Sequence, residues 1–173
     1  MINNIHKVLG IAVSTAAMLS FFSLSASPIE HVLRYNKPAP STDSGWEKES
    51  LPLGCAHFGV SVFGGVEHDR IQVTHNAVLS GREKKRGAAN LTNALEINLD
   101  FNAGEYSNYE RGLSLDRASA WTKYDCGGVS FKREYFTSYP ARVLAVRLTA
   151  SAKGAVSFVL RPEIPFLEPW NKK

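Results

Sequence analysis

The residues from Ala94 to Phe101 alternate between apolar and polar side chains, and this pattern limits the possible folds more than any other feature. Successive side chains of a β-strand point to opposite faces of a sheet, so the segment predicts a strand with one buried and one solvated face. The apolar face would carry Leu95, Ile97, Leu99 and Phe101, and the polar face would carry Glu96, Asn98 and Asp100.

Glycine pairs separate further alternating segments. Gly127-Gly128 follows the run 118–124 and precedes Val129, and Gly64-Gly65 lies between the runs 59–63 and 70–73. Tight turns between antiparallel strands need positive φ angles, which glycine adopts without a steric penalty. Each glycine pair therefore predicts a hairpin.

The end of the sequence predicts one more pair of strands, over 142–149 and 155–160, joined by the short segment 150–154. Pro162 and Pro165 would end the ladder, because proline has no backbone N–H to donate. Short strands with glycine-rich turns and almost no helical periodicity predict an all-β fold, an antiparallel β-sandwich. We place this sandwich at residues 46–165, after a Pro- and Ser-rich lead-in at 27–45, and interpret 80–93 as a surface connection.

The first 26 residues are typical of a cleaved signal peptide. Lys7 is followed by an apolar run from Val8 to Leu24 and by small residues before Pro28. This arrangement fits a secretory signal better than the alternative, a retained membrane anchor. No cysteine lies near the cleavage point, which excludes a lipid anchor. We expect a periplasmic or secreted protein without membrane contact after cleavage.

The formal net charge of +4 does not indicate a nucleic-acid partner. Lys7 and the cluster Arg82–Arg86 carry the whole surplus, so the rest of the chain is neutral. Nucleic-acid binding needs a basic face or stripe, and one short basic segment does not supply it.

No catalytic or metal-binding group stands out. The carboxylate pairs Glu67/Asp69 and Glu47/Glu49 predict solvated surface, because nothing near them indicates the burial that would separate their pKa values. The histidines lack the helical spacing of a zinc site, and no nucleophile elbow or phosphate loop occurs. We expect neither metal nor cofactor.

The cysteines and tryptophans leave alternatives open. Cys55 and Cys126 could form a disulfide in an oxidising compartment, or could be two free, buried thiols. Trp121 lies on a predicted strand and is expected in the core. Trp46 and Trp170, in predicted loops, could equally be core residues or flat faces for sugar rings.

Several blocks of the sequence resemble the amino-terminal domain of glycoside hydrolase family 95. The most specific is Val62-Phe-Gly-Gly-Val-Glu67, and the resemblance extends from about Leu33 to Arg161. The other blocks are Trp46-Glu47, Ser50-Leu-Pro-Leu-Gly54, Phe58–Val62, Asp69-Arg-Ile-Gln72, Ser80-Gly81, Tyr109–Asp116, 118–124, Gly127-Gly128, Lys132–Pro140 and 143–149.

The resemblance implies a β-sandwich that supports the cleft of a following (α/α)₆ barrel. Family 95 enzymes are inverting α-L-fucosidases, some of which act on α-L-galactosides, and their acid and base lie in the barrel. An inverting mechanism needs two separated groups with a water between them. No catalytic residue is therefore carried over, and we expect this chain alone to be inactive. Residues 166–173 are interpreted as the truncated start of a linker to a missing barrel.

Two departures from the family pattern concern the sugar. The chain has Gly54-Cys55-Ala56 where the family has Gly-Asn-Gly, and His75 and Leu79 replace an acid and a tryptophan. His75, Asn76 and Trp46 are our candidate substrate-binding residues, although His75 and Asn76 are also typical of ordinary turns. If this loop faces the sugar, an α-L-galactoside becomes a candidate substrate.

The sequence thus leads to a main hypothesis, the non-catalytic amino-terminal portion of a secreted glycosidase whose carbohydrate partners, fucosylated or galactosylated glycans, bind through the barrel. The alternative is a stand-alone carbohydrate-binding module, and a third hypothesis is complementation by a separate barrel chain. A barrel-coding sequence after Lys173 would support the first hypothesis. That hypothesis also predicts an exposed apolar patch.

Overall fold

The computed structural model describes residues 30–80 and 90–165. The expected signal peptide, the basic cluster Arg82–Arg86, Trp170 and the expected linker at 166–173 lie outside these residues. So does most of the segment interpreted as a surface connection.

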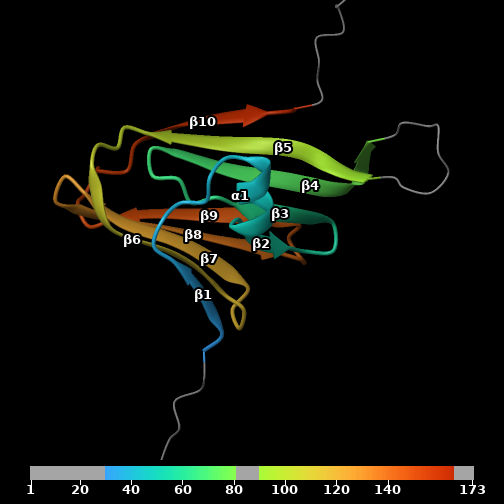
Figure 1. The fold of residues 1–173 in the computed structure, drawn as a ribbon, viewed down its shortest axis with the longest axis horizontal. Coiled ribbons are helices and arrows are strands. Elements are labelled where there is room, and N and C mark those ends of the chain that lie inside the picture. Colours follow the sequence, from blue (N-terminus) through green and yellow to red (C-terminus); the bar gives the residue numbers. More distant parts are fainter. Residues whose placement is uncertain (1–29, 81–89, 166–173) are drawn as a thin grey trace, which may run out of the picture.

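Two five-stranded sheets pack face to face, and every strand pairing in the described part of the chain is antiparallel. The first sheet has the order β1-β6-β7-β8-β9 and the second has the order β10-β5-β4-β3-β2 (Figure 1). The all-β, antiparallel sandwich is therefore confirmed. The elements are β1 (Val32–Tyr35), α1 (Asp43–Lys48), β2 (Leu51–Gly54), β3 (Phe58–Val62), β4 (His68–Ser80), β5 (Asn90–Phe101), β6 (Tyr106–Ser114), β7 (Ser119–Cys126), β8 (Val129–Ser138), β9 (Val143–Ala150) and β10 (Phe158–Glu163).

The core lies between the sheets and is built from alternating side chains of their strands. Leu99 of β5 is buried, in agreement with the alternation of 94–101, while Ile97 and Phe101 are partly buried against the same cluster. The buried members of the cluster are Leu51, Leu53, Val60, Val62, Ile71, Leu99, Leu113, Ala120 and Tyr135.

The hairpin at Gly127-Gly128 is confirmed. Cys126 pairs with Val129, so the two glycines form the whole loop between β7 and β8. Their φ angles are 58° and 78°, in the region that favours glycine. The hairpin between β3 and β4 is also confirmed, with Val62 opposite Ile71 and Gly64-Gly65 in the connection.

The prediction that 142–149 and 155–160 pair with each other is wrong. β9 pairs with β8 in the first sheet, whereas β10 pairs with β5 in the second sheet, where Leu160 lies opposite Leu99. The segment between β9 and β10 therefore crosses from one sheet to the other. Pro162 lies inside β10 instead of ending it, because β10 is an edge strand and needs only one row of hydrogen bonds.

The sandwich also begins earlier than residue 46. β1 lies within the expected lead-in and pairs along its length with β6. Trp46 is on the short helix α1 and not in a loop. Thr42 caps this helix, its side-chain oxygen accepting a hydrogen bond from the backbone N–H of Gly45 at 3.1 Å, and Asp43 adds a favourable charge in the first turn.

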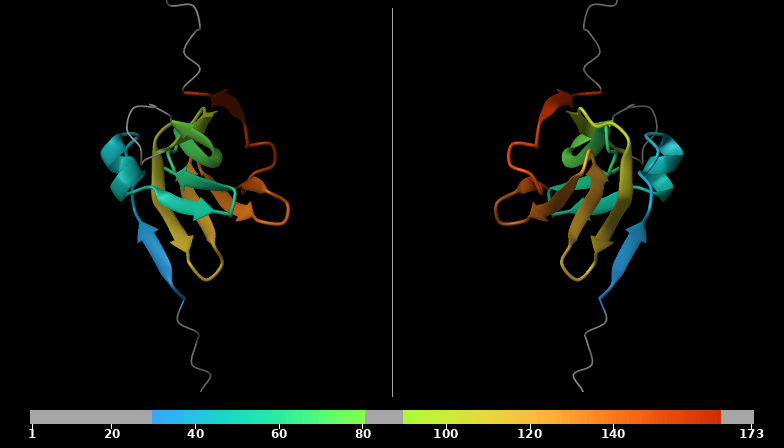
Figure 2. Two further views of the ribbon diagram at one scale, coloured as in Figure 1. Left: turned by 90° about the vertical axis from the view of Figure 1, so that its right-hand side faces the viewer. Right: turned by 90° about the vertical axis from the view of Figure 1, so that its left-hand side faces the viewer.

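The end-on views place α1 and β10 on opposite sides of the sandwich (Figure 2). No helix among the residues that the structure describes is both long enough and apolar enough to cross a membrane.

Candidate functional site

Two of the three candidate substrate-binding residues, His75 and Asn76, line a shallow hollow at one end of the second sheet. Its volume is about 300 Å³. The turn between β2 and β3 forms one side and β4 forms the other. We call it the β2–β3 hollow, and its lining residues are Gly54, Cys55, Ala56, His57, Phe58, Gly59, Thr74, His75 and Asn76.

Backbone pairing fixes the two candidate residues against the turn. His75 lies opposite Phe58, and the backbone N–H of Asn76 donates to the carbonyl oxygen of His57 at 3.1 Å. The turn itself is closed by a hydrogen bond from the N–H of Cys55 to the oxygen of Phe58 at 3.0 Å. The hollow therefore rests on ladder hydrogen bonds and not on side-chain packing alone.

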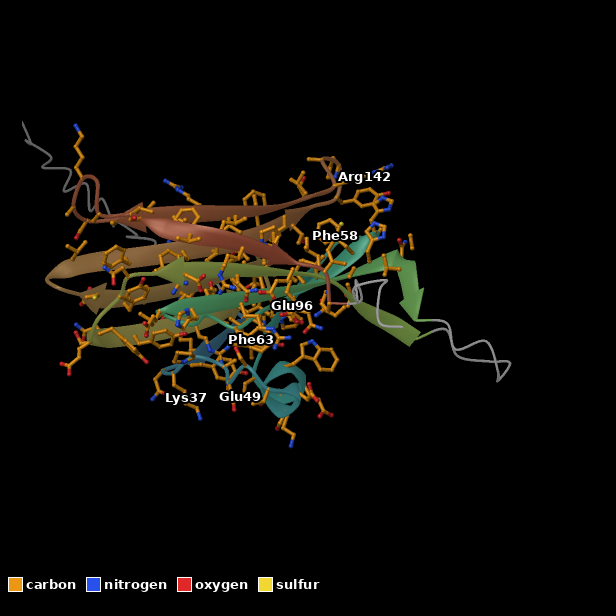
Figure 3. The ribbon with its side chains drawn as sticks, turned by 90° about the horizontal axis from the view of Figure 1, so that it is seen from above. Lys37, Glu49, Phe58, Phe63, Glu96 and Arg142 are labelled. Carbon is orange, nitrogen blue, oxygen red and sulfur yellow. The ribbon has the colours of Figure 1, made fainter. Side chains whose placement is uncertain are left out.

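The first sheet contributes to the same end of the sandwich. Thr137 donates from its hydroxyl to the carbonyl oxygen of Gly54 at 2.7 Å, and the rings of His57 and Tyr139 stack with centroids 6.0 Å apart. Figure 3 shows Phe58 at this end, together with Arg142 of the β8–β9 connection. Tyr139 belongs to the same connection. The β2–β3 hollow thus lies beside the connection between β8 and β9 of the first sheet.

The imidazole of His75 is oriented by its own turn. Its Nδ1 accepts a hydrogen bond from the backbone N–H of Ala77 at 3.1 Å. An accepting Nδ1 places the ring proton of a neutral histidine on Nε2, which then remains a donor. A sugar hydroxyl is a suitable acceptor for such a group.

Trp46 is not part of this hollow. From α1 its indole Nε1 donates to the hydroxyl of Ser61 on β3 at 3.1 Å, and the residue is 45% exposed. Ser61 lies three positions along β3 from Phe58. The structure therefore brings His75 and Asn76 together but places Trp46 apart from them.

The described residues offer no obvious catalytic pair at the β2–β3 hollow. Its lining contains no carboxylate, whereas glycoside hydrolysis uses two. Among residues 30–80 and 90–165, no group of three or more His, Cys, Asp or Glu is placed to hold a metal ion. The arrangement is able to bind hydroxyl groups and to shape a surface.

The residues that carry the family resemblance converge on a different place, inside the sandwich. Asp69 of β4 is 1% exposed and forms an ion pair with Arg133 of β8, Oδ2 to Nη1, at 3.0 Å. Tyr135 donates its phenol hydrogen to the same carboxylate oxygen at 2.5 Å. We call Asp69, Arg133 and Tyr135 the buried polar cluster.

The prediction that Asp69 is solvated surface is therefore wrong, although Glu67, its neighbour two residues earlier, is exposed. The partners of Asp69 come from the other sheet, and spacing along one strand gives no sign of them. Burial opposes the charged form of Arg133, but the facing Tyr135 and Asp69 hold its pKa above the usual value. Burial, reinforced by Asp69, raises the pKa of Tyr135, which stays a neutral donor.

The glycine pair of the Val-Phe-Gly-Gly-Val-Glu block is attached to this cluster. Arg133 donates from Nη2 to the carbonyl oxygen of Gly65 at 2.5 Å, and Tyr109 donates to that of Gly64 at 2.6 Å. Gly64 has a φ of 72°, and a Cβ there would approach the hydroxyl oxygen of Thr122 to 2.8 Å. The most specific block of the sequence is thus explained by packing.

A second buried arginine, on β6, binds the backbone of the segments on either side of α1. Arg111 of β6 donates from Nε to the oxygen of Lys37 at 2.8 Å and from Nη1 to the oxygen of Glu49 at 2.6 Å. Its guanidinium lies over the ring of Tyr35, 4.2 Å from the centroid. Figure 3 shows Lys37 and Glu49 together beside α1. Sequence reasoning missed this role, since a lone arginine in a strand is typical of a solvated face.

The structure describes both cysteines and Trp121. Cys55 and Cys126 are both free and partly exposed, so they form no disulfide with each other, and the thiols are not fully buried. Trp121 is half-buried on the outer face of the first sheet, and the expectation that it lies in the core is wrong. Its neighbour on the strand, Thr122, faces inward and is fully buried.

Comparisons with known proteins support the resemblance. Residues 90–168 match the family model "Glycosyl hydrolase family 65, N-terminal domain". This match, which includes β5 to β10, supports an amino-terminal domain of a glycoside hydrolase. "Alpha-L-fucosidase 2" of Arabidopsis thaliana is 24% identical over 148 residues, covering 64% of this chain. The chain spans 18% of the length of that relative.

The two matches differ in family number. The model is named for family 65, whereas the sequence blocks resemble family 95, and the name of the relative agrees with the fucosidases of the latter. The residues that match the model include β5 to β8, where Arg111, Arg133 and Tyr135 lie. The shared feature is the amino-terminal domain itself.

Proposed function

We propose that this chain is the non-catalytic amino-terminal portion of an exported glycoside hydrolase that acts on α-L-fucosides or α-L-galactosides. The observation that carries the proposal is the position of the sequence blocks that resemble family 95. They form buried contacts between the sheets and leave the open hollow without a carboxylate pair. The sandwich supports the cleft, and the acid and base belong to an (α/α)₆ barrel.

The β2–β3 hollow is the surface that we propose to face the cleft. His75 and Asn76 follow one another on β4, opposite a β2–β3 turn that also accepts a hydrogen bond from the first sheet. A histidine that donates from Nε2 favours a substrate with a hydroxyl at that point. An α-L-galactoside differs from an α-L-fucoside by one additional hydroxyl, so this residue fits the former better.

A domain exchange tests the proposal. The purified full-length chain is assayed with 4-nitrophenyl α-L-fucoside and α-L-galactoside, and no turnover is expected. Residues 30–165 are then placed before the catalytic barrel of a family 95 fucosidase, in exchange for its own amino-terminal domain. Restored turnover, with a higher ratio of galactoside to fucoside cleavage than in the parent enzyme, supports the proposal.

Histidine variants of the hybrid give the matched comparison. His75→Ala should lower kcat/KM about tenfold or more, the loss typical of a missing hydrogen bond to the substrate. His68→Ala changes an exposed histidine at the first position of β4, seven residues before His75, and should leave kcat/KM unchanged. Turnover by the isolated chain, or an inactive but folded hybrid, would contradict the proposal.

Export is part of the proposal and is tested separately. When the full chain is expressed in a bacterium, it should accumulate outside the cytoplasm, and mass spectrometry of the mature protein should give an amino terminus at residue 26 or 27. A retained Met1 in the recovered protein would contradict export.

A free-standing carbohydrate-binding module is the second candidate function, favoured by the exposed ring of Trp46. Titration with fucosylated and galactosylated glycans should then saturate and be abolished by Trp46→Ala. Flat titrations count against this function.

A further inference from the structure

The outer face of the first sheet carries a hollow that the proposed function does not use. It has a volume of about 260 Å³ and lies over β1, β6, β7 and β8. A second hollow of about 290 Å³ adjoins it and shares the residues Arg117, Ser119 and Glu134. Trp121 lines the first hollow and Phe136 lines the second.

The indole of Trp121 lies against the sheet because its neighbour has no side chain. Gly112 on β6 is opposite Trp121 in the ladder, and a Cβ at Gly112 would overlap the outer carbons of the indole ring. The indole Nε1 donates to a carboxylate oxygen of Glu110 at 3.3 Å. The ring is therefore fixed in orientation before any ligand arrives.

Charged side chains surround this ring. Arg34 donates to Glu110 at 2.6 Å, and its guanidinium carbon lies 5.6 Å from the centre of the indole. Glu110 also pairs with Lys123 at 3.3 Å. Although partial burial opposes ionisation, the hydrogen bonds from Lys123 and Trp121 and the charge of Arg34 hold the pKa of Glu110 below its usual value. The carboxylate thus remains an acceptor.

Phe136 provides a second exposed aromatic ring on the same face of the sheet. Trp121 lies opposite Glu134, and Phe136 follows Glu134 by two positions along β8. The two aromatic residues are therefore diagonal neighbours, and the Cα atoms of such neighbours typically lie about 7–8 Å apart. Phe136 is 47% exposed, because its ladder partners Ser119 and Ala145 are small. Glu134 neighbours both residues, because it lies opposite Trp121 and two positions before Phe136 on β8.

We infer that this outer face binds a neutral oligosaccharide, with one sugar ring on Trp121 and the next on Phe136. A pyranose ring has an apolar C–H face that packs on an aromatic surface, and a rim of hydroxyls that suits ionised carboxylates and guanidinium groups. Two aromatic rings on one face, with Glu134 and Arg117 lining both adjoining hollows, match that pattern. We call this surface the Trp121 face.

Other ligand classes fit less well. The core of a protein–protein interface is depleted in charged residues, whereas four basic and three acidic side chains line the first hollow. A nucleic acid would bring its phosphates against Glu30, Glu110 and Glu134. The inference does not depend on the proposed glycosidase role, since it concerns binding and not turnover.

A titration followed by ¹H–¹⁵N NMR tests the inference on the full chain. The probes are lactose, 2′-fucosyllactose and cellotetraose. We expect saturable shifts for at least one probe, confined to amides of β6, β7 and β8. Shifts confined to the β2–β3 hollow, or no saturable shift with any probe, would overturn the inference.

Variants separate the Trp121 face from other aromatic surfaces. Trp121→Ala should weaken binding about tenfold or more, as expected for a buried aromatic contact. Phe136→Ser changes an exposed ring and cannot leave a cavity, so it keeps the test valid if Trp121→Ala does not fold. It should weaken binding of cellotetraose more than that of lactose.

Phe158→Ser is the matched control, because it removes an exposed aromatic ring from β10, in the other sheet of the sandwich. It should leave the affinity unchanged. Loss of binding in Trp46→Ala with normal binding in both Trp121→Ala and Phe136→Ser would assign the sugar to α1 and overturn the inference.

Discussion

Arg133 extends from β8 across the interior and donates a hydrogen bond to the carbonyl oxygen of Gly65, 2.5 Å away, in the connection between β3 and β4. The same guanidinium forms its ion pair with Asp69, just beyond the end of that connection. One side chain of the first sheet therefore holds both sides of a turn in the second sheet. The two sheets are joined by directional contacts as well as by apolar packing.

We expect Asp69→Asn to be strongly destabilising. The change leaves the charge of Arg133 buried and without its ionic partner, and breaking such a pair typically costs about 3–5 kcal/mol. Urea denaturation followed by circular dichroism measures the loss. Glu134→Gln breaks a partly exposed pair with Lys132 and should cost less than about 1 kcal/mol. Equal losses in the two variants would refute the role assigned to the buried polar cluster.

Gly64→Ala should lower the free energy of unfolding by about 1–3 kcal/mol, because alanine is strained at positive φ and its methyl group would press on Thr122. Gly104→Ala is the control. A Cβ at Gly104 meets nothing within 4 Å, so a change within about 0.5 kcal/mol is expected. The comparison is made by thermal and urea unfolding. A neutral Gly64→Ala would show that the turn tolerates a side chain.

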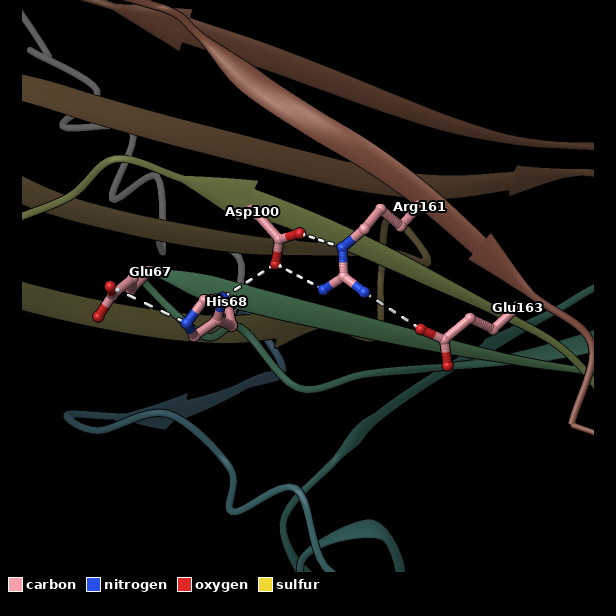
Figure 4. A network of polar contacts seen from close by, with 5 residues as sticks. All are labelled: Glu67, His68, Asp100, Arg161 and Glu163. Carbon is pink, nitrogen blue, oxygen red and sulfur yellow. Dashed lines mark hydrogen bonds and ion pairs between the residues drawn. The ribbon is translucent and has the colours of Figure 1, made fainter.

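Acid should weaken the attachment of β10 to β5. Hydrogen bonds from Arg161 and His68 lower the pKa of Asp100 to about 2 (Figure 4). Because the pKa is lower in the folded state, this contribution to stability is complete above the unfolded value, about 4, and is lost as the pH falls towards 2. An NMR titration of the Asp100 carboxyl, with amide exchange in β10 at each pH, measures the effect.

Asp100→Asn should remove the part of the acid dependence that belongs to β10. Glu163→Gln keeps both hydrogen-bond donors of Asp100, since Glu163 contacts only the opposite side of Arg161 at 3.2 Å, and should retain it. A carboxyl of Asp100 that titrates near 4 would contradict the geometry.

Both cysteines should react as thiols. The denatured protein, prepared without reductant, is expected to give two equivalents with a thiol reagent, because Cys55 and Cys126 are free. A reduced sample is the control and should give the same value. Mass spectrometric detection of a peptide that joins the two residues would show instead that a disulfide forms.

Local patterns predicted the local structure. The alternation of 94–101 identified most of β5, and the glycine pairs identified two hairpins, because strand period and turn conformation depend on neighbouring residues alone. The partner of β10 did not follow from the sequence. Consecutive strands usually pair, but the segment between β9 and β10 changes sheets, and β10 pairs with the edge of β5, a strand much earlier in the chain.

The candidate sites were likewise predicted only as far as local sequence determines them. His75 and Asn76 lie together, as neighbours in sequence must, but the approach of His57 and Tyr139 depends on how the two sheets end. The sequence pattern around Asp69 is that of a surface residue, because its partners, Arg133 and Tyr135, belong to a strand much later in the chain. Burial of a polar residue is a property of tertiary pairing.

β10 is the last strand of the described chain, and all six of its residues are exposed, including Phe158 and Leu160 on the side that continues the apolar surface of Phe101 and Leu99. During synthesis, the edge of β5 that binds β10 stays unpaired until every other described element has left the ribosome. A nascent chain of this protein therefore presents an open edge of β5 to chaperones while β6 to β9 are being synthesised.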